Sequence, residues 1–176
     1  DALDQIGWDR EQLVNFPLED EAAFAVLNEE RYAGIFQFEG YALQSVTRQM
    51  KVHKFEDVAA ITALARPGPL NSGGTTQYIK RHTGAEPVEY LHPLTEAITK
   101  VTNGVVVYQE QVMMIGRDVG GLSWEDVSSL RKAMSKSLGQ EFFDTYFDKF
   151  KEGAEKNGIN EDKARYIWDH IITMGF

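Results

Sequence analysis

The sequence predicts an all-α fold of about nine helices with at most one or two very short extended segments. Three observations lead to this prediction. Apolar residues recur at helical spacing along most of the chain, capping residues precede these stretches, and glycine or proline follows them. The runs 35–38 and 105–108, which alternate weakly or are β-branched, are each only four residues long.

In the first half of the chain, Asp20 is predicted to cap a helix that Gly34 ends. Apolar residues at helical spacing predict two further helices over 43–50 and 55–64. The sequence Arg-Pro-Gly-Pro at 66–69 should end the third helix, because a residue before proline avoids the helical region. A flexible turn at residues 72–74 then precedes a helix near 75–82.

In the second half, each predicted helix has a recognisable first residue. His92 is followed by Pro93 at the first helical position, and Ser123 is followed by Asp126 in a capping-box pattern. Asn160 should cap the last helix. The expected inner faces are Leu94, Ile98 and Val101; Val112, Ile115 and Val119; Val127, Leu130, Met134 and Leu138; the aromatic stretch 142–150; and Ile167, Trp168 and Ile171.

The composition excludes several chemistries before any motif is considered. The chain has 176 residues and no cysteine, so thiol catalysis, disulfide scaffolds, iron–sulfur clusters and cysteine zinc sites are excluded. The net charge of −9 is concentrated at the ends: residues 1–30 hold nine acids and one base, whereas residues 31–137 hold twelve bases and ten acids. This charge distribution is compatible with a local phosphate-binding site in the middle region. It does not predict that the whole domain binds DNA electrostatically.

The sequence also indicates where the protein works and how it is divided. No apolar run approaches the ~20 residues of a membrane span, and no signal-peptide pattern is present, so we expect a cytoplasmic protein without a membrane partner. The chain lacks an initiator methionine and a tail, which indicates a fragment of a longer protein. We divide it into an acidic connector with the first helix, 1–30, and a main domain, 31–176.

Two stretches could bind an anion. In the first, Arg66 stands beside a proline- and glycine-rich corner that leads into a helix start, where free backbone N–H groups favour negative charge. In the second, Arg131, Lys132 and Lys136 follow one another on a predicted helix without an intervening acid. The alternatives are a simple helix connection for the first stretch and a solvated helix face for the second.

Further candidates surround these stretches. Tyr108 could stack on a base, and the long polar side chains of Gln109 and Gln111 could join a hydrogen-bond network. The consecutive residues Lys80, Arg81 and His82 could form a basic patch. The four histidines lack metal-helix spacing, and no two aspartates stand at i and i+2, so no metal site is predicted.

The order of these motifs is more informative than any one of them. The chain resembles the C-family replicative DNA polymerases of bacteria or their phages, the family of the DNA polymerase III alpha subunit, along its whole length. The motifs that support the resemblance are Gly-Ile-Phe-Gln-Phe-Glu-Gly at 34–40, Phe-Glu-Asp at 55–57, Arg-Pro-Gly-Pro-Leu at 66–70, Tyr-Gln-Glu-Gln-Val-Met at 108–113, Leu-Arg-Lys-Ala-Met-Ser-Lys at 130–136 and Gly175-Phe176.

The resemblance implies a mostly helical fingers region that closes over the incoming deoxynucleoside triphosphate. It implies phosphate contacts from Arg131 and Lys132, with Arg66 and Lys136 as further candidates. The catalytic aspartates and the Mg²⁺ ions that they bind would belong to a palm outside this chain. Residues 1–30 would then connect to that palm, and the isolated fragment would be inactive. Primer-template DNA and other replisome subunits are the implied partners.

The chain departs from the family pattern at three positions near the cationic helix. Lys132 replaces the second arginine of a common Arg-Arg pair, Ser135 replaces a usual glycine, and Ser137 replaces a usual lysine. Lysine keeps the charge but loses the bidentate geometry of arginine, which suggests a divergent relative. Two other functions remain open: a non-catalytic helical protein-interaction module, favoured by the acidic first 30 residues, and a free-standing anion-binding domain.

Overall fold

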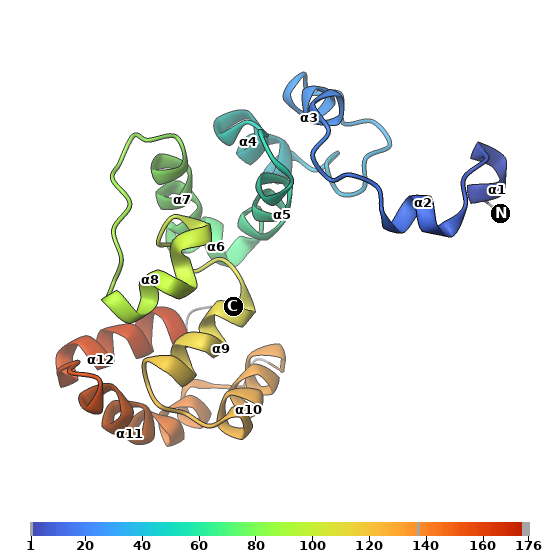
Figure 1. The fold of residues 1–176 in the computed structure, drawn as a ribbon. Helices are drawn as coiled ribbons and strands as arrows, with labels where there is room; N and C mark the ends of the chain where they lie inside the picture. The colour runs from blue at the N-terminus through green and yellow to red at the C-terminus, as the bar shows by residue number, and fades with distance from the viewer. Residues whose placement is uncertain (1, 137, 174–176) are drawn as a thin grey trace. The chain divides into compact units, whose positions relative to one another are not determined.

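The computed structural model describes residues 2–136 and 138–173, and Figure 1 shows their helices in chain order. Contacts divide the chain into two compact units, Asp1–Ile61 and Thr62–Phe176, a division that falls later in the chain than the boundary predicted at residue 30. The first unit contains α1 (Ala2–Ile6), α2 (Arg10–Val14), α3 (Glu21–Asn28), α4 (Tyr41–Met50) and most of α5 (Phe55–Leu64).

The second unit holds the remaining helices. They are α6 (Pro67–Ser72), α7 (Gly74–His82), α8 (Pro93–Thr99), the short 3₁₀ helix η1 (Lys100–Thr102), α9 (Gln109–Asp118), α10 (Trp124–Ser135), α11 (Gln140–Lys156), α12 (Glu161–Ile167) and the π-helical turn η2 (Trp168–Ile172). The described residues include no strand and nine α-helices of seven or more residues, which confirms the all-α prediction.

The first unit is small, and its core lies between α3 and α4. Asn28 at the end of α3 joins the core to the segment after α4, because its side-chain amide donates to the Val52 carbonyl at 2.7 Å and accepts from the Val52 N–H at 2.8 Å. Asp57 accepts from the His53 and Lys54 N–H groups and caps α5. By contrast, α1 and α2 bury none of their residues.

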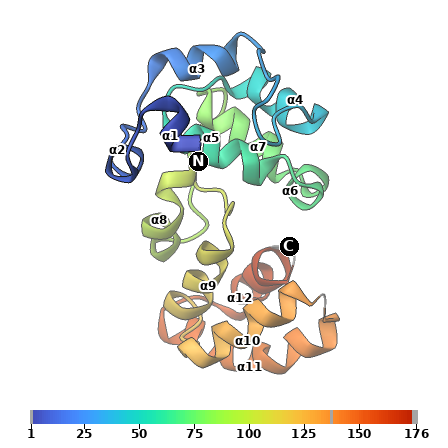
Figure 2. The ribbon, with the colours of Figure 1, turned by 90° about the vertical axis from the view of Figure 1, so that its right-hand side faces the viewer.

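The second unit has the larger core, in which α9 to η2 pack together around Phe150 and Trp168. Both rings are fully buried, and their centroids lie 5.1 Å apart. Figure 2 shows α9 leading down from α8 into this group of helices. The buried residues include the predicted inner faces of α9 and α10, namely Val112, Ile115, Val119, Val127 and Leu130.

Local capping predictions are confirmed. Asp20 accepts from two N–H groups at the start of α3, and Asn160 accepts from Lys163 at the start of α12. Ser123 and Asp126 form the reciprocal capping box of α10. These predictions succeed because a cap and its N–H partners lie within three residues of each other.

Four local predictions are wrong. In the predicted inner face of Leu94, Ile98 and Val101, only Ile98 is buried, whereas Leu94 is 39% and Val101 74% exposed. The helix capped by Asp20 ends at Asn28 rather than at Gly34, and Glu30 then adopts a left-handed φ of 62°. Residues 35–38 are not extended: they form successive turns, with the Phe38 N–H donating to the Ile35 carbonyl at 3.1 Å. A four-residue run without a neighbouring strand has no ladder to stabilise an extended backbone.

The fourth wrong prediction concerns Leu138, which was expected on the inner face of the helix that starts after Ser123. The helix ends at Ser135, so its register does not reach Leu138, and that side chain is 42% exposed. Gly175 and Phe176, which contribute to the family pattern, and Ser137, which departs from it, lie outside the described residues.

The cap of α8 makes the stability of the second unit depend on pH. His92 Nδ1 accepts from the Leu94 N–H at 3.3 Å, so the cap requires this nitrogen to be unprotonated. Burial and the charge of Lys163 lower the pKa of His92. The pKa of His92 is therefore lower in the folded than in the unfolded protein. The stability that the neutral cap contributes is complete above the unfolded pKa of about 6.5, and it is lost as the pH falls through the folded pKa.

We therefore expect His92→Asn to reduce the pH dependence of stability. Asparagine caps a helix and does not titrate. The His92 cap contributes about 1 kcal/mol to the free energy of unfolding, but only above its folded pKa. Urea unfolding of both proteins at about pH 7.5 and about pH 5.5 measures the effect. The wild type should lose more stability between these two conditions than the variant, and equal losses would contradict the assignment of His92 as a neutral cap.

Candidate functional site

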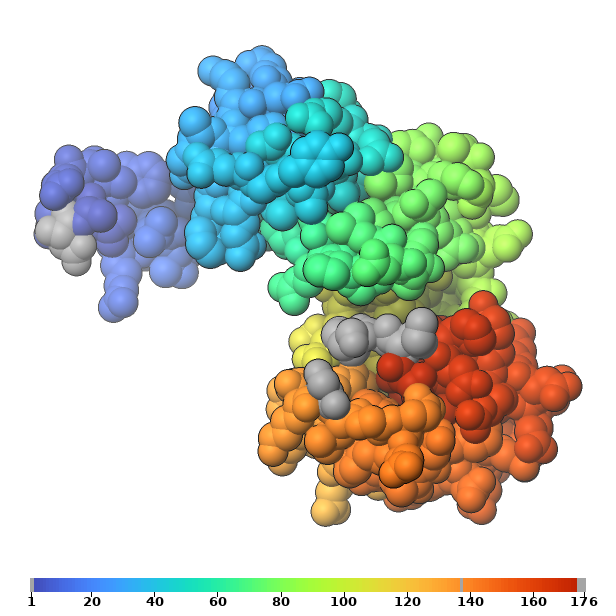
Figure 3. Space-filling view, turned by 180° about the vertical axis from the view of Figure 1, so that it is seen from behind, coloured from blue at the N-terminus to red at the C-terminus, as the bar shows by residue number. Residues whose placement is uncertain are grey.

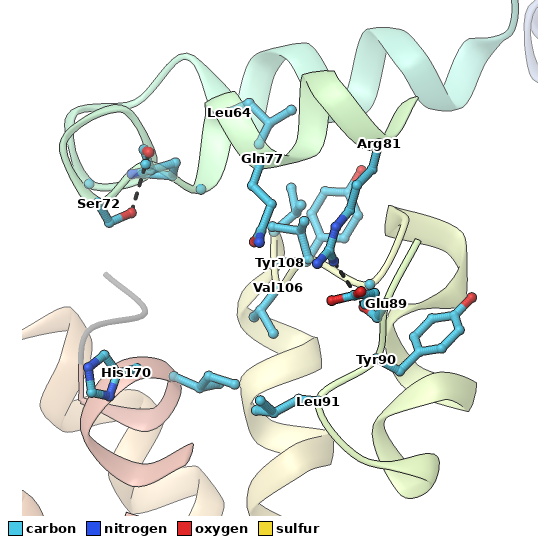
Figure 4. A pocket seen from close by; sticks show the side chains of 18 of the residues that line it. Leu64, Ser72, Gln77, Arg81, Glu89, Tyr90, Leu91, Val106, Tyr108 and His170 are labelled. Atoms are coloured by element: carbon cyan, nitrogen blue, oxygen red, sulfur yellow. Dashed lines mark hydrogen bonds between the residues drawn. The ribbon is translucent and has the colours of Figure 1, made fainter. Parts of the chain in front are cut away.

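The second unit contains a cleft of about 670 Å³ whose walls come from four segments of the chain. They are residues 64–81 around α6 and α7, residues 89–91, the exit from η1 at 104–108, and residues 166–171 around η2. Figure 4 shows Gln77 and Arg81 reaching from α7 toward Val106 and Glu89, with His170 on the other side. Both polar and apolar side chains line this cleft.

Arg81 forms part of the wall of this cleft. Its Nη1 atom donates to the Glu89 carbonyl at 2.9 Å and to the Asn103 carbonyl at 3.2 Å. Its Nε atom is buried and has no hydrogen-bond partner among the described residues. The guanidinium therefore fastens the segment before α8 to the turn after η1, and it brings a positive charge to the cleft.

The neighbours of Arg81 in the predicted basic patch do not line the cleft. Lys80 forms an exposed ion pair with Glu86 at 2.7 Å, and the His82 ring stacks on Tyr78 with the ring centroids 5.7 Å apart. Consecutive residues on a helix point in directions about 100° apart, so residues 80–82 do not share one face.

Gln111 holds the entry to α9 in place. Its buried side chain accepts from the Val107 and Tyr108 N–H groups at 2.8 and 3.0 Å, and it donates to the Ile98 carbonyl and the Thr102 hydroxyl. The amide therefore uses its oxygen and its nitrogen inside the protein. Tyr108, which it positions, lines the cleft, whereas Gln109 is half-buried in the first turn of α9 and does not line it.

The proline-glycine corner is a short helix rather than the loop that the sequence suggested. Pro67 and Pro69 both fall in the first turn of α6, where the N–H groups that proline lacks would have no partner within the helix. Arg66 is the extended N-cap residue before this helix, and its side chain is exposed. Gly68, Pro69 and Ser72 of α6 line the cleft, but Arg66 does not.

The cationic cluster lies at the end of α10. Arg131, Lys132 and Lys136 are exposed, and none of them forms an ion pair with a carboxylate in the described part of the chain. Figure 3 shows the surface of α10 to α12, in orange to red, below the green surface of α6 and α7. Like Arg66, the three cations do not line the cleft.

The start of α10 is tied to α11 by a charged contact. Lys149 donates to the Asp126 carboxylate, which also accepts from the Ser123 hydroxyl. These two hydrogen bonds lower the pKa of Asp126, with the Lys149 contact as the larger cause. The contact orients the helix that presents Arg131, Lys132 and Lys136.

The cleft therefore brings together only two of the residues selected from the sequence, Arg81 and Tyr108. It also includes Gln77, Glu89 and His170, which sequence reasoning did not select for a site. Gln77 could have been found, because it stands four residues before Arg81 and shares its helix face. The turn η2 that places His170 left no comparable signal.

The described residues contain no group of three or more histidine, aspartate or glutamate side chains arranged to hold a metal ion. Among the same residues, no helix combines the length and the apolar character that crossing a membrane requires.

Comparison with known proteins identifies the family. The model of the bacterial DNA polymerase III alpha subunit finger domain matches residues 2–158. The DNA polymerase III subunit alpha of Aquifex aeolicus (strain VF5) is 40% identical over 161 residues, which cover 90% of this chain and 14% of that protein. The same subunit of Staphylococcus aureus (strain Mu50 / ATCC 700699) is 39% identical over 158 residues, covering 90% of this chain and 15% of that protein.

The chain thus spans 14 to 15% of the length of these two relatives. The match covers α1 to α11 and includes the proline-glycine corner, the entry to α9 and the cationic end of α10. The chain belongs to the bacterial DNA polymerase III alpha subunit finger domain family.

Proposed function

We propose that these residues bind the triphosphate of an incoming deoxynucleotide within an intact replicative DNA polymerase and position it for template-directed synthesis. The observation that supports this proposal is the set of three exposed cations at the end of α10, Arg131, Lys132 and Lys136, without an ion-pair partner among the described residues. An unpaired cation need not break an existing contact to meet a phosphate. Arg66, equally exposed and unpaired in the described structure, is a further candidate.

Electrostatics favours such a role over a merely solvated helix face. Two unit charges 4 Å apart attract by about 4 kcal/mol at an effective dielectric constant near 20, before desolvation is subtracted. The helix end by itself attracts a nearby cation by only about 0.3–1 kcal/mol. A polyphosphate that meets several of these side chains at once would add several such attractions, each reduced by desolvation and by solvent screening of the exposed cations.

The cleft supports a second part of the proposal. Arg81 and Tyr108 lie in its wall and would face the nucleotide or the DNA near it, and Gln111 would act by holding Tyr108 in place. Gln109, Lys80 and His82 remain candidates for contacts to DNA outside the cleft. Primer-template DNA would bind through the intact enzyme, and other replisome subunits are further expected partners.

The chemical step would depend on a part of the polymerase outside this chain. We propose that Mg²⁺ ions bound by a palm domain supply the chemistry of nucleotidyl transfer. Two metal ions promote such a reaction by stabilising the attacking and the leaving oxygen. The residues described here would bind and orient the triphosphate and would neutralise its charge. For this reason we expect no primer extension by residues 1–176 alone.

The test is to replace Arg131 with alanine in the intact polymerase. Loss of one charge-assisted contact costs about 1.5–3 kcal/mol, so we expect the KM for deoxynucleotides to rise roughly ten- to a hundredfold. Arg131→Ala combined with Lys132→Ala should have a larger effect. Lys132→Arg should keep KM at or below the wild-type value, because arginine can bind a phosphate through two parallel hydrogen bonds. Steady-state primer extension measures these values.

Lys100→Ala is the matched control. Lys100 is an exposed cation on η1 that also has no ion pair in the described structure, and the proposal gives it no contact. Its removal should leave KM unchanged. If KM and kcat both stay at wild-type values in the double variant, Arg131 and Lys132 do not bind the triphosphate.

A further inference from the structure

A turn in the first unit presents two aromatic side chains to solvent. Phe36 is 84% exposed and Tyr41, the first residue of α4, is 80% exposed. The turn belongs to the motif at 34–40 that supported the family resemblance, yet nothing in the proposed nucleotide site uses it. Exposed aromatic residues of this size are costly to leave in water and are enriched where proteins bind each other.

The turn is held rigid by its own hydrogen bonds. The Ile35, Phe38 and Gly40 N–H groups donate to carbonyls three residues earlier, at 3.0 to 3.2 Å. The Glu39 carboxylate accepts from the Gly34 N–H at 3.1 Å. From α4, the Gln44 amide donates to the carbonyls of Phe38 and Glu39 at 3.3 and 3.1 Å. A turn tied at so many points presents Phe36 in one place.

Backbone strain separates the two phenylalanines of the turn. Gln37, which lies between them, has a φ of 65°. This left-handed conformation is energetically unfavourable for any residue other than glycine. Phe38 is 3% exposed, and its ring stacks on Tyr32 with the ring centroids 6.3 Å apart. The fold thus keeps Gln37 in an unfavourable backbone conformation, with Phe38 buried and Phe36 exposed to solvent. Backbone strain of this kind is typical of functional segments.

Charge indicates the kind of partner. Residues 1–61 contain twelve acids and five bases, so this unit repels a nucleic-acid backbone. Large apolar side chains are also concentrated here: of the fifteen that are exposed among the described residues, seven lie before residue 42. An acidic surface with apolar anchors is complementary to a protein surface that has an apolar pocket and a basic rim.

We propose that Phe36 and Tyr41 dock this unit onto another part of the same alpha subunit, in an apolar pocket with basic side chains at its rim. The relatives have six to seven times the length of this match, so most of such a subunit lies outside these residues and could provide the pocket. The proposal rests on family membership and is independent of the triphosphate contacts of α10. Docking of a rigid aromatic anchor needs little ordering and therefore favours a stable contact.

Site-specific photo-crosslinking in the full-length alpha subunit tests the proposal. The photoreactive amino acid p-benzoylphenylalanine replaces Phe36 in one protein and Tyr41 in a second, and mass spectrometry identifies the crosslinked peptides with and without primer-template DNA. We expect both positions to crosslink to the same peptide region, which lies outside residues 1–176 of the same polypeptide. The yield should not depend on protein concentration, because the contact is intramolecular.

The control position is Val101, an apolar residue on η1 that is 74% exposed. It should not crosslink to the peptide region that Phe36 and Tyr41 reach. Crosslinks from position 36 to DNA, only to residues 1–176, or only to a second molecule would overturn the proposal, as would the absence of any crosslink from both positions. The substitutions change no residue of α10, so the KM for deoxynucleotides of the Arg131 variants reports on the triphosphate site separately.

A second measurement does not depend on the photochemistry. Phe36→Ser in the full-length subunit should speed amide hydrogen exchange of residues 31–41 several-fold, because the docked turn becomes exposed to solvent. Val101→Ser should leave the exchange of these residues unchanged. An unchanged exchange rate in the Phe36 variant would contradict docking at this turn.

Discussion

Gly153→Ala should destabilise the second unit by about 2 kcal/mol or more, although alanine is the better helix former. Gly153 lies inside α11, where a Cβ atom would be 1.9 Å from the Gly120 carbonyl oxygen and 2.4 Å from its carbon. Helix propensity alone would favour alanine by about 1 kcal/mol. The clash is with backbone, which no side-chain rotation relieves, and overpacking of this kind typically costs about 1–3 kcal/mol or more.

The turn after α9 meets α11 closely at more than one point, which makes relaxation difficult. A Cβ on Gly120 would lie 1.9 Å from the fully buried Phe150 ring, and a Cβ on Gly121 would lie 3.2 Å from the Gly153 Cα. Asn157 at the end of α11 donates to the carbonyls of Asp118 and Val119 and holds the same two segments together. Separating them would move α11 away from its contact with α10.

Thermal unfolding of the chain, followed by helical circular dichroism, measures this effect. A loss of about 2 kcal/mol lowers the Tm of a protein of this size by roughly 4–8 °C. Gly139→Ala is the matched control, since Gly139 precedes the same helix at a φ of −64° with nothing within 4 Å of an added Cβ. Because Gly139 is the N-cap of α11, where glycine is preferred to alanine, the control should lose less than about 1 kcal/mol. A Gly153 variant as stable as the wild type would show that the backbones do not approach so closely.

Gly104→Ala should destabilise the protein by roughly 2–4 kcal/mol and open one wall of the cleft. Gly104 has a φ of 74°, and an added Cβ would lie 2.2 Å from the Glu89 carbonyl oxygen and 2.8 Å from Arg81 Nη1. The substitution therefore adds left-handed strain and also pushes apart the groups that the Arg81 hydrogen bonds join. Urea unfolding gives the free energy change from the shift in midpoint.

Gly84→Ala separates the two causes. Gly84 has nearly the same φ, 76°, but an added Cβ would meet nothing within 4 Å. Gly84→Ala should lower the free energy of unfolding only by the cost of the left-handed conformation, about 1–2 kcal/mol. The difference between the two variants measures the clash at the cleft wall. Equal losses at both positions would mean that Gly104 is needed for its backbone conformation alone.

Features that depend on neighbouring residues were predictable from the sequence. Ser123, His92 and Asn160 begin helices as expected, because a side-chain oxygen or nitrogen and the N–H group that it caps lie within three residues. Helical spacing identified the buried faces of α9 and α10 because periodicity reports which side avoids water. The fold class needed no more than these local rules.

Features of the candidate site were only partly predictable. The sequence identified Arg81 and Tyr108, which line the cleft, and the unpaired cations of α10, which do not. It could not show that Lys80 pairs with Glu86, because that contact depends on how the segment after α7 turns back. Gln111 was selected for its polarity, but its position between Ile98, Thr102 and Val107 follows from the packing of α8 against α9.

The sequence by itself determined an all-α protein, the helix starts and a cationic stretch ending near Lys136, because these depend on interactions over a few residues. Its ordered motifs also indicated the polymerase family, which the comparisons confirmed. Only the tertiary structure decided which side chains share the cleft, where Gly153 and Gly120 touch, and that Phe36 stays outside while Phe38 is buried. These outcomes depend on the packing of segments far apart in the chain, and local rules contain no information about such distances.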